Sequence, residues 1–161
     1  MKSISLISIA VVMIALAGYG CSDKKLSSGT YTMSQINFTE DECYLQEALS
    51  EGTEIHVTIK DKAITISFGD EQTPHTGTIS DNSFTALAAK ESDTIPDTNC
   101  EDKWSKKMTG TLTRENVFTG AYEFSEETVK GTDCSDESKI GFKPPRCTTT
   151  MTFTATKKPG A

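Results

Sequence analysis

Apolar and polar residues alternate along most of this chain, and that alternation constrains its fold more than any other feature. In the segment 54–60, Ile55, Val57 and Ile59 fall on one face of an extended backbone, and polar residues fall on the other. Successive side chains of a strand point to opposite faces, so this period marks a half-buried strand. The same pattern predicts eight strands, at 29–36, 54–60, 63–68, 75–80, 83–89, 107–113, 117–124 and 147–156.

The connections between the predicted strands alternate between short and long. Tight turns at 61–62, 81–82 and 114–116 are typical of antiparallel neighbours. Eight antiparallel strands with one apolar face lose both exposed edges by closing, so we predict an all-β fold, an eight-stranded up-and-down antiparallel barrel. In that order, all the longer connections gather at one end. They are 37–53, 69–74, 90–106 and 125–146.

This layout resembles the lipocalin-like (calycin) barrels over most of 29–157, which we predict to be a single domain with a short tail at 158–161. Gly29-Thr30-Tyr31 stands where that family has a Gly-x-Trp near its first strand. The resemblance implies an open mouth ringed by the long loops and an end closed by tight turns. The side chains expected inside are Tyr31, Met33, Ile55, Val57, Ile59, Ile64, Ile66, Phe68, Ile79, Phe84, Leu112, Phe118, Tyr122, Phe124, Met151 and Phe153.

The first long connection contains a helical pattern. Thr39 followed by Glu42 is a capping-box spacing, and Leu45 and Leu49 continue an apolar stripe. We predict a short helix at about 40–50. Across the barrel mouth it would serve either as a lid or as a plug that completes the core.

The N-terminal residues have the pattern of a targeting segment. Lys2 precedes an apolar run at 4–17, which is shorter than the roughly 20 residues that a membrane-spanning helix needs. Cys21 follows directly after Gly20, an arrangement that resembles a bacterial lipoprotein signal. The resemblance implies a signal peptide at 1–20, acylation of Cys21 and a lipidated tether at 21–28.

The same resemblance also implies a cellular location, and the sequence offers one alternative cleavage site. Ser22 after the Cys favours an outer membrane, so the expected location is the cell envelope, with the membrane bound through the lipid on Cys21. The segment 15–17 is also an A-x-A site for ordinary signal peptidase, which would release a soluble chain beginning at Gly18.

Cysteine parity favours acylation. Exported proteins normally pair their cysteines, and acylating Cys21 leaves an even number. Three pairings of the remaining four are open, and we favour Cys43–Cys100 with Cys134–Cys147 because the second closes a short local loop. The sequence contains no Cys-x-x-Cys spacing of the kind that binds zinc. We therefore predict four disulfide cysteines and no metal.

Charge is distributed unevenly along the chain. Its net charge of −7 argues against nucleic acid as a partner. Of its 23 acidic residues, 17 fall in the four longer connections. Lys60, Lys62 and Arg114 lie at the opposite end, with the tight turns. Because the tether joins the barrel at that end, it should face an anionic membrane. The acidic loops are solvated charge, a surface for a basic protein or a weak Ca²⁺ site. Tyr44 and Trp104 are candidate recognition residues, and the alternative for Trp104 is that it caps the barrel mouth as part of the core.

Signs of catalysis are missing from the sequence. His56 and His75 are the only histidines, and neither lies in a nucleophile, metal or phosphate-binding motif. We therefore predict no enzymatic activity and no cofactor. The leading interpretation is a lipoprotein that acts as an interaction or structural module. The alternatives are a carrier of a small apolar ligand and an inhibitor of an extracytoplasmic hydrolase.

Overall fold

Eight antiparallel strands form one closed barrel in the computed structural model, which describes residues 25–69 and 73–160. Each strand pairs with the next in sequence and β1 pairs with β8, so the predicted fold class is confirmed. The strands are β1 (Gly29–Asp41), β2 (Glu54–Lys60), β3 (Ala63–Phe68), β4 (His75–Ser80), β5 (Ser83–Thr94), β6 (Glu101–Arg114), β7 (Val117–Lys130) and β8 (Arg146–Lys157). The connections contain the 3-10 turns η1 (Leu45–Glu47) and η2 (Thr132–Ser135) and the short helix α1 (Glu137–Ile140).

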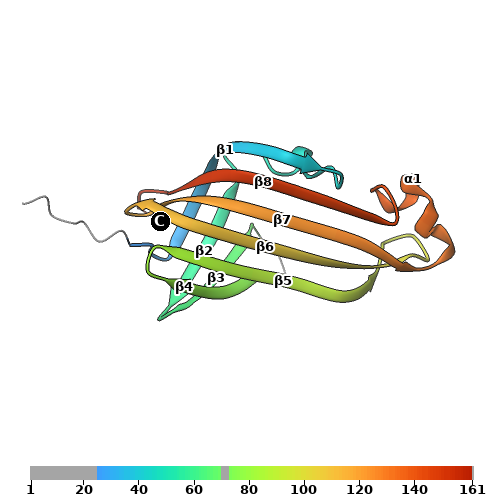
Figure 1. Cartoon of the computed structure of the whole chain (residues 1–161), viewed down its shortest axis with the longest axis horizontal. Helices are drawn as coiled ribbons and strands as arrows, with labels where there is room; N and C mark the ends of the chain where they lie inside the picture. Colours follow the sequence, from blue (N-terminus) through green and yellow to red (C-terminus); the bar gives the residue numbers. More distant parts are fainter. Residues whose placement is uncertain (1–24, 70–72, 161) are drawn as a thin grey trace, which may run out of the picture.

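The molecule has two different ends (Figure 1). At one end, which we call the base, lie the tight turns 61–62, 81–82 and 115–116, together with residues 25–28 and the end of β8. At the opposite, distal end lie the connections 95–100 and 131–145. The predicted signal peptide at 1–20, the lipidation site Cys21 and the first part of the tether lie outside the described residues.

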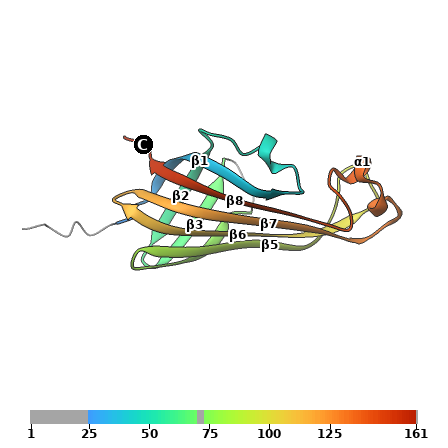
Figure 2. The same cartoon turned by 45° about the horizontal axis from the view of Figure 1, so that its top comes forward.

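Strands β5 to β8 run far beyond the barrel as a four-stranded sheet, visible as the long arm in Figures 1 and 2. This distal sheet consists of the residues beyond the β4–β5 pairing, 88–94, 101–106, 124–130 and 146–149. The prediction of loops throughout 90–106 and 125–146 was therefore wrong for much of both segments. Backbone ladders and cross-strand ion pairs such as Lys103–Glu127, at 3.4 Å, hold this sheet where no apolar alternation marks it.

The inward face of β6, β7 and β8 changes from apolar to charged between the base and the distal end. Its first three layers belong to the core, whereas the last two bring Lys106, Trp104 and Glu126 to the barrel mouth. In order from the base, the layers are Leu112–Phe118–Ala155, Gly110–Gly120–Phe153, Met108–Tyr122–Met151, Lys106–Phe124–Thr149 and Trp104–Glu126–Cys147.

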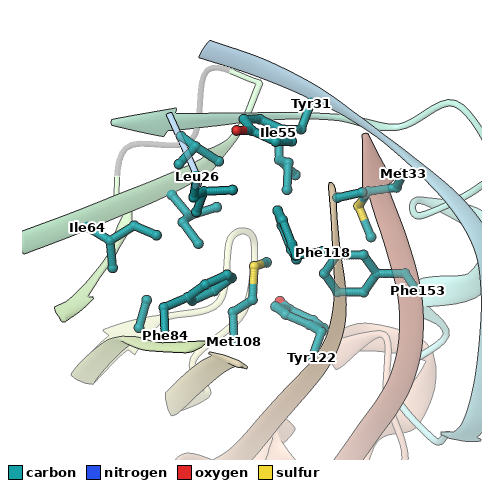
Figure 3. Close-up of a cluster of buried hydrophobic side chains, with 14 of the residues drawn as sticks. Leu26, Tyr31, Met33, Ile55, Ile64, Phe84, Met108, Phe118, Tyr122 and Phe153 are labelled. Atoms are coloured by element: carbon teal, nitrogen blue, oxygen red, sulfur yellow. The ribbon is translucent and has the colours of Figure 1, made fainter. Parts of the chain in front are cut away.

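Aromatic rings fill the part of the barrel nearest the base (Figure 3). The Phe118 ring centroid lies 5.7 Å from that of Tyr31, 5.1 Å from that of Phe84 and 5.9 Å from that of Phe153. Most residues predicted to face inward are buried, and Met108, which was not predicted, joins them. The predicted interior residues that are only partly buried are Ile59, Phe68 and Ile79.

Two glycines make room for these rings. A Cβ on Gly110 would lie 2.2 Å from Cε1 of Phe84, and one on Gly120 would lie 2.5 Å from Cζ of Phe153. Both distances are far shorter than van der Waals contact. The inner face of the sheet therefore accepts only glycine at these two positions without a shift of the rings.

We predict that Gly110→Ala lowers the free energy of unfolding by about 1–3 kcal/mol, because the added methyl overpacks the core. Denaturant unfolding measures the change. The control is Thr111→Ala, an exposed neighbour on the same strand, which should change stability by less than about 0.5 kcal/mol. Equal stability of Gly110→Ala and the unsubstituted protein would contradict this account of the packing.

Candidate functional site

Two disulfides cross-link the chain toward the distal end. Cys43 is bonded to Cys147, and Cys100 to Cys134, at sequence separations of 104 and 34. Three of these cysteines lie in the longer connections that were predicted to gather at one end, and the two bridges bring all four together there, but the favoured pairing, Cys43–Cys100 with Cys134–Cys147, was wrong.

Strand register explains the pairing that forms. Strand β1 continues alongside β8 as far as Asp41, which is paired with Thr149, so the next turn brings Cys43 beside Cys147. Strands β6 and β7 pair from Glu101 and Lys130 onward, which brings the segments that flank them, and hence Cys100 and Cys134, together. The sequence did not reveal that these strands extend so far.

The distal end has a small core of its own. Cys100, Ile140, Phe142 and Cys147 are all at most 7 % exposed and form a cluster separate from the barrel core. Reciprocal hydrogen bonds join the two loops over it: the backbone N–H of Asn99 donates to Asp133 Oδ2 at 3.1 Å, and that of Asp133 donates to Asn99 Oδ1 at 2.8 Å. The loops are thus held in one arrangement.

Peptide mapping without reductant should recover Cys43 linked to Cys147 and Cys100 linked to Cys134. Replacing both Cys100 and Cys134 by Ser should lower the free energy of unfolding by about 2–4 kcal/mol, since the unfolded chain loses a cross-link. Denaturant unfolding of the oxidised proteins checks the magnitude. Recovery of a Cys134–Cys147 peptide would instead contradict the register described for β8.

The first connection acts as a plug of the mouth. The predicted helix at 40–50 is one 3-10 turn, η1, because Thr39 bonds to Thr150 across the sheet and does not cap a helix. Asp41 takes over the capping role, since its carboxylate accepts hydrogen bonds from the backbone N–H of Leu45 at 2.8 Å and of Gln46 at 3.0 Å. Leu45 and Leu49 pack against the barrel core. These contacts favour the plug over the lid.

The two candidate recognition residues occupy different environments. Tyr44 is 53 % exposed, and its hydroxyl donates to Glu137 Oε1 at 2.9 Å, a bond that links the first connection to α1 and raises the pKa of the Tyr44 hydroxyl. Trp104, predicted to lie in a loop, is instead on the inner face of β6 and half-buried, with Lys106 Nζ 4.7 Å from its ring centroid. Only Tyr44 offers a largely exposed ring.

A pair of carboxyl groups lies next to Trp104 on the same inner face. Asp102 is only 6 % exposed, and Glu126 is aligned with Trp104 across the sheet. Burial, a hydrogen bond with Asp102 and the negative charge of Asp102 together raise the pKa of Glu126 to about 8, although Lys106 opposes the shift. At neutral pH the pair therefore holds one proton, because two carboxylates this close cannot both ionise cheaply.

Protonation of Glu126 has a consequence for stability. Its pKa is about 8 in the folded chain against an ordinary value of 4.5, so between these pH values the folded state binds a proton that the unfolded state has released. The contribution of Glu126 to the free energy of unfolding therefore falls as pH rises through this range.

We predict that Glu126→Gln gains stability relative to the unsubstituted protein between about pH 5 and pH 8, because the amide stays neutral at every pH. Denaturant unfolding at both ends of this pH range gives, for each protein, the slope of the free energy of unfolding against pH. Glu123→Gln, on the exposed outer face of β7, serves as the control and should keep the original slope. Identical slopes for the Glu126 variant and the unsubstituted protein would show that Glu126 is ionised throughout.

Sequence reasoning missed the burial of His75. It was predicted at the start of a strand, which is correct, but its side chain is 0 % exposed inside the barrel. Its ring centroid lies 5.9 Å from that of Phe68 and 5.8 Å from that of Tyr122. The signal was present in the alternation of 75–80, which puts His75 on the same face as Ile79. His56 is exposed, as predicted.

Lysines pair with two of the acidic groups of the distal end. Hydrogen bonds from lysine ammonium groups lower the pKa of Glu101, through Lys130, and of Asp133, through Lys139. Beyond these pairs, acidic side chains of the distal half stand exposed to solvent; they include Glu40, Glu42, Glu47, Asp97 and Glu137. The distal end thus presents negative charge on a cross-linked framework.

Hollows on the barrel open outward. One of about 430 Å³ is lined by Thr109, Thr119 and Thr152 on the outer face of β6, β7 and β8. Another of about 450 Å³ lies beside it, with Leu87 and Glu123 in its lining. Neither hollow is enclosed by the aromatic side chains that fill the barrel.

Comparison with known proteins assigns the chain to no family. No family model matches the chain, and no match was found among curated proteins or solved structures. Within residues 25–69 and 73–160, no three His, Cys, Asp or Glu side chains are grouped so that they could hold a metal ion. In the same part of the chain, no helix combines the length and the apolar character needed to cross a membrane.

Proposed function

We propose that this protein is a non-enzymatic lipoprotein of the cell envelope, anchored through acylated Cys21, that binds a basic protein with its distal end. The observation that carries the proposal is the pair of disulfides that holds acidic loops at the pole opposite residues 25–28 (Figure 1). Disulfides persist in oxidising compartments outside the cytoplasm, which supports export.

A rigid acidic surface suits a basic partner on physical grounds. Loops that are already ordered lose little conformational entropy when a partner binds. Complementary charge speeds encounter and rejects partners of the same sign. The exposed ring of Tyr44 supplies an aromatic contact beside Glu137, in the kind of position where aromatic anchors stabilise interfaces.

The carrier alternative receives less support. Phe118 and its three ring neighbours fill the barrel near the base, and Leu45 and Leu49 pack over the mouth. The hollows noted above open on the outer face. An inhibitor of an extracytoplasmic hydrolase remains one form that a partner-binding role could take.

Binding through the distal end can be tested by capture from an envelope extract. The triple variant Glu42→Gln, Glu47→Gln, Asp97→Asn should weaken capture of basic proteins by roughly 3- to 100-fold, at the strength usual for exposed ion pairs. The matched control, Asp61→Asn, Asp81→Asn, Glu115→Gln, removes the same charge from the base and should leave capture unchanged. Quantitative mass spectrometry at low and high salt provides the readout.

Two results would count against this role. Capture that is insensitive to salt would exclude an electrostatic interface. Equal weakening by the two triple variants would show that total charge matters and that the distal end does not.

Anchoring can be tested by intact mass and fractionation. The mature chain should begin at acylated Cys21, and Cys21→Ser should move the protein from the membrane fraction to the soluble fraction. A mature chain that begins at Gly18 without lipid would overturn the anchor.

A further inference from the structure

Residues 25–28 are fixed to the base of the barrel, although the sequence predicts them as part of a tether. Leu26 is 4 % exposed and belongs to the main core (Figure 3). On either side of it, the backbone is held by the last tight turn: Asn116 N–H donates to the carbonyl of Lys25 at 3.0 Å, and Ser27 N–H donates to Asn116 Oδ1 at 3.1 Å. The chain is therefore anchored to the barrel four residues before β1 begins.

A second group of hydrogen bonds closes around Ser27. The Tyr31 hydroxyl donates to the carbonyl of Ser27 at 2.7 Å, and Lys157 Nζ donates to Ser27 Oγ at 2.8 Å. These bonds join the segment to the first and the last strand. If Cys21 is acylated, only residues 21–24 separate the lipid from this fixed segment.

Such a short tether limits where the barrel can lie. An extended chain spans at most about 3.3–3.6 Å per residue, so Cys21 can be no more than roughly 14 Å from Lys25. If Cys21 is acylated at the membrane surface, the base must remain close to the lipid headgroups.

The base carries the charge that suits anionic headgroups. Its exposed cations, Lys25, Lys60, Lys62 and Arg114, come from three separate segments that meet there. Lys158 also lies at the base, where it pairs with Glu54 at 2.6 Å. The acids of the tight turns, Asp61, Asp81 and Glu115, are fewer than these cations, whereas the chain as a whole has a net charge of −7. The rest of the molecule is therefore strongly negative.

We propose that the base of the barrel is a docking surface for anionic lipid headgroups, and that it holds the barrel upright with its distal end directed away from the membrane. This inference rests on the proposed acylation of Cys21. The positive base is attracted to the surface potential of an anionic leaflet, and the acidic distal end is repelled by it. A barrel lying on its side would bring acidic groups of the distal sheet toward the headgroups.

Lysine labelling of the anchored protein tests the orientation. The acylated full mature chain is reconstituted into vesicles of phosphatidylcholine with phosphatidylglycerol, or of phosphatidylcholine alone, and treated with an amine-acetylating reagent. In the anionic vesicles, labelling of Lys25, Lys60 and Lys62 should fall at least threefold relative to the neutral vesicles. Lys103 and Lys130, in the distal sheet, should be labelled equally in both and serve as the internal control.

Charge reversal tests whether the cations are responsible. Lys60→Glu with Lys62→Glu should restore labelling of Lys25 in the anionic vesicles. The matched control, Lys130→Glu with Lys143→Glu, should leave Lys25 protected. All four positions are exposed, and circular dichroism confirms that the variants fold.

The outcomes separate this inference from the proposed anchor. The N-terminal peptide in the same digest reports acylation, and its absence would overturn the anchor and the orientation together. An acylated chain whose base and distal lysines are protected to the same degree would overturn the orientation alone. Protection of Lys25 that survives the Lys60 and Lys62 reversal would also overturn it, since the cations would then have no part.

Discussion

The antiparallel ladder between β1 and β8 is the interaction on which the rest of the structure depends. At the base it pairs Tyr31 with Lys157, and toward the distal end it pairs Asp41 with Thr149. By closing the ring, the ladder removes the exposed sheet edges within the barrel, which would otherwise invite aggregation. It also positions Cys43 for its disulfide with Cys147 and sets Asp41 where its carboxylate can cap η1. One pairing therefore closes the barrel and builds the mouth.

The two ends of the barrel differ because its interior changes along the axis. Near the base, Phe118 and its ring neighbours leave no place for a charge, and Leu26 completes that core. Toward the mouth, the same inward face presents Lys106, Trp104 and Glu126. The carboxyl pair of Asp102 and Glu126 is tolerated there because a proton remains on it near neutral pH. A filled base and a charged, cross-linked distal end are compatible with the proposed attachment at one pole and the proposed recognition at the other.

The bounds of some strands could be predicted from the sequence, and those of others could not. Strands β2, β3 and β4 have the predicted bounds because they are rich in β-branched residues and each adjoins a tight turn. The distal ends of β5, β6 and β7 were missed because those parts are mostly charged residues, Ser and Thr, which carry no apolar period. In those parts the ladder persists through backbone hydrogen bonds and pairs such as Lys103–Glu127, at 3.4 Å.

The order of apolar, polar and turn residues was enough to determine a closed eight-stranded barrel, the inward-facing core and the end that holds the cysteines, because each follows from local alternation and connection length. It could not determine the Cys43–Cys147 pairing, the proton on Glu126 or the fixing of Leu26 into the base. Those properties depend on how far neighbouring strands run and on which side chains meet across them, and distances of that kind exist only in the folded chain.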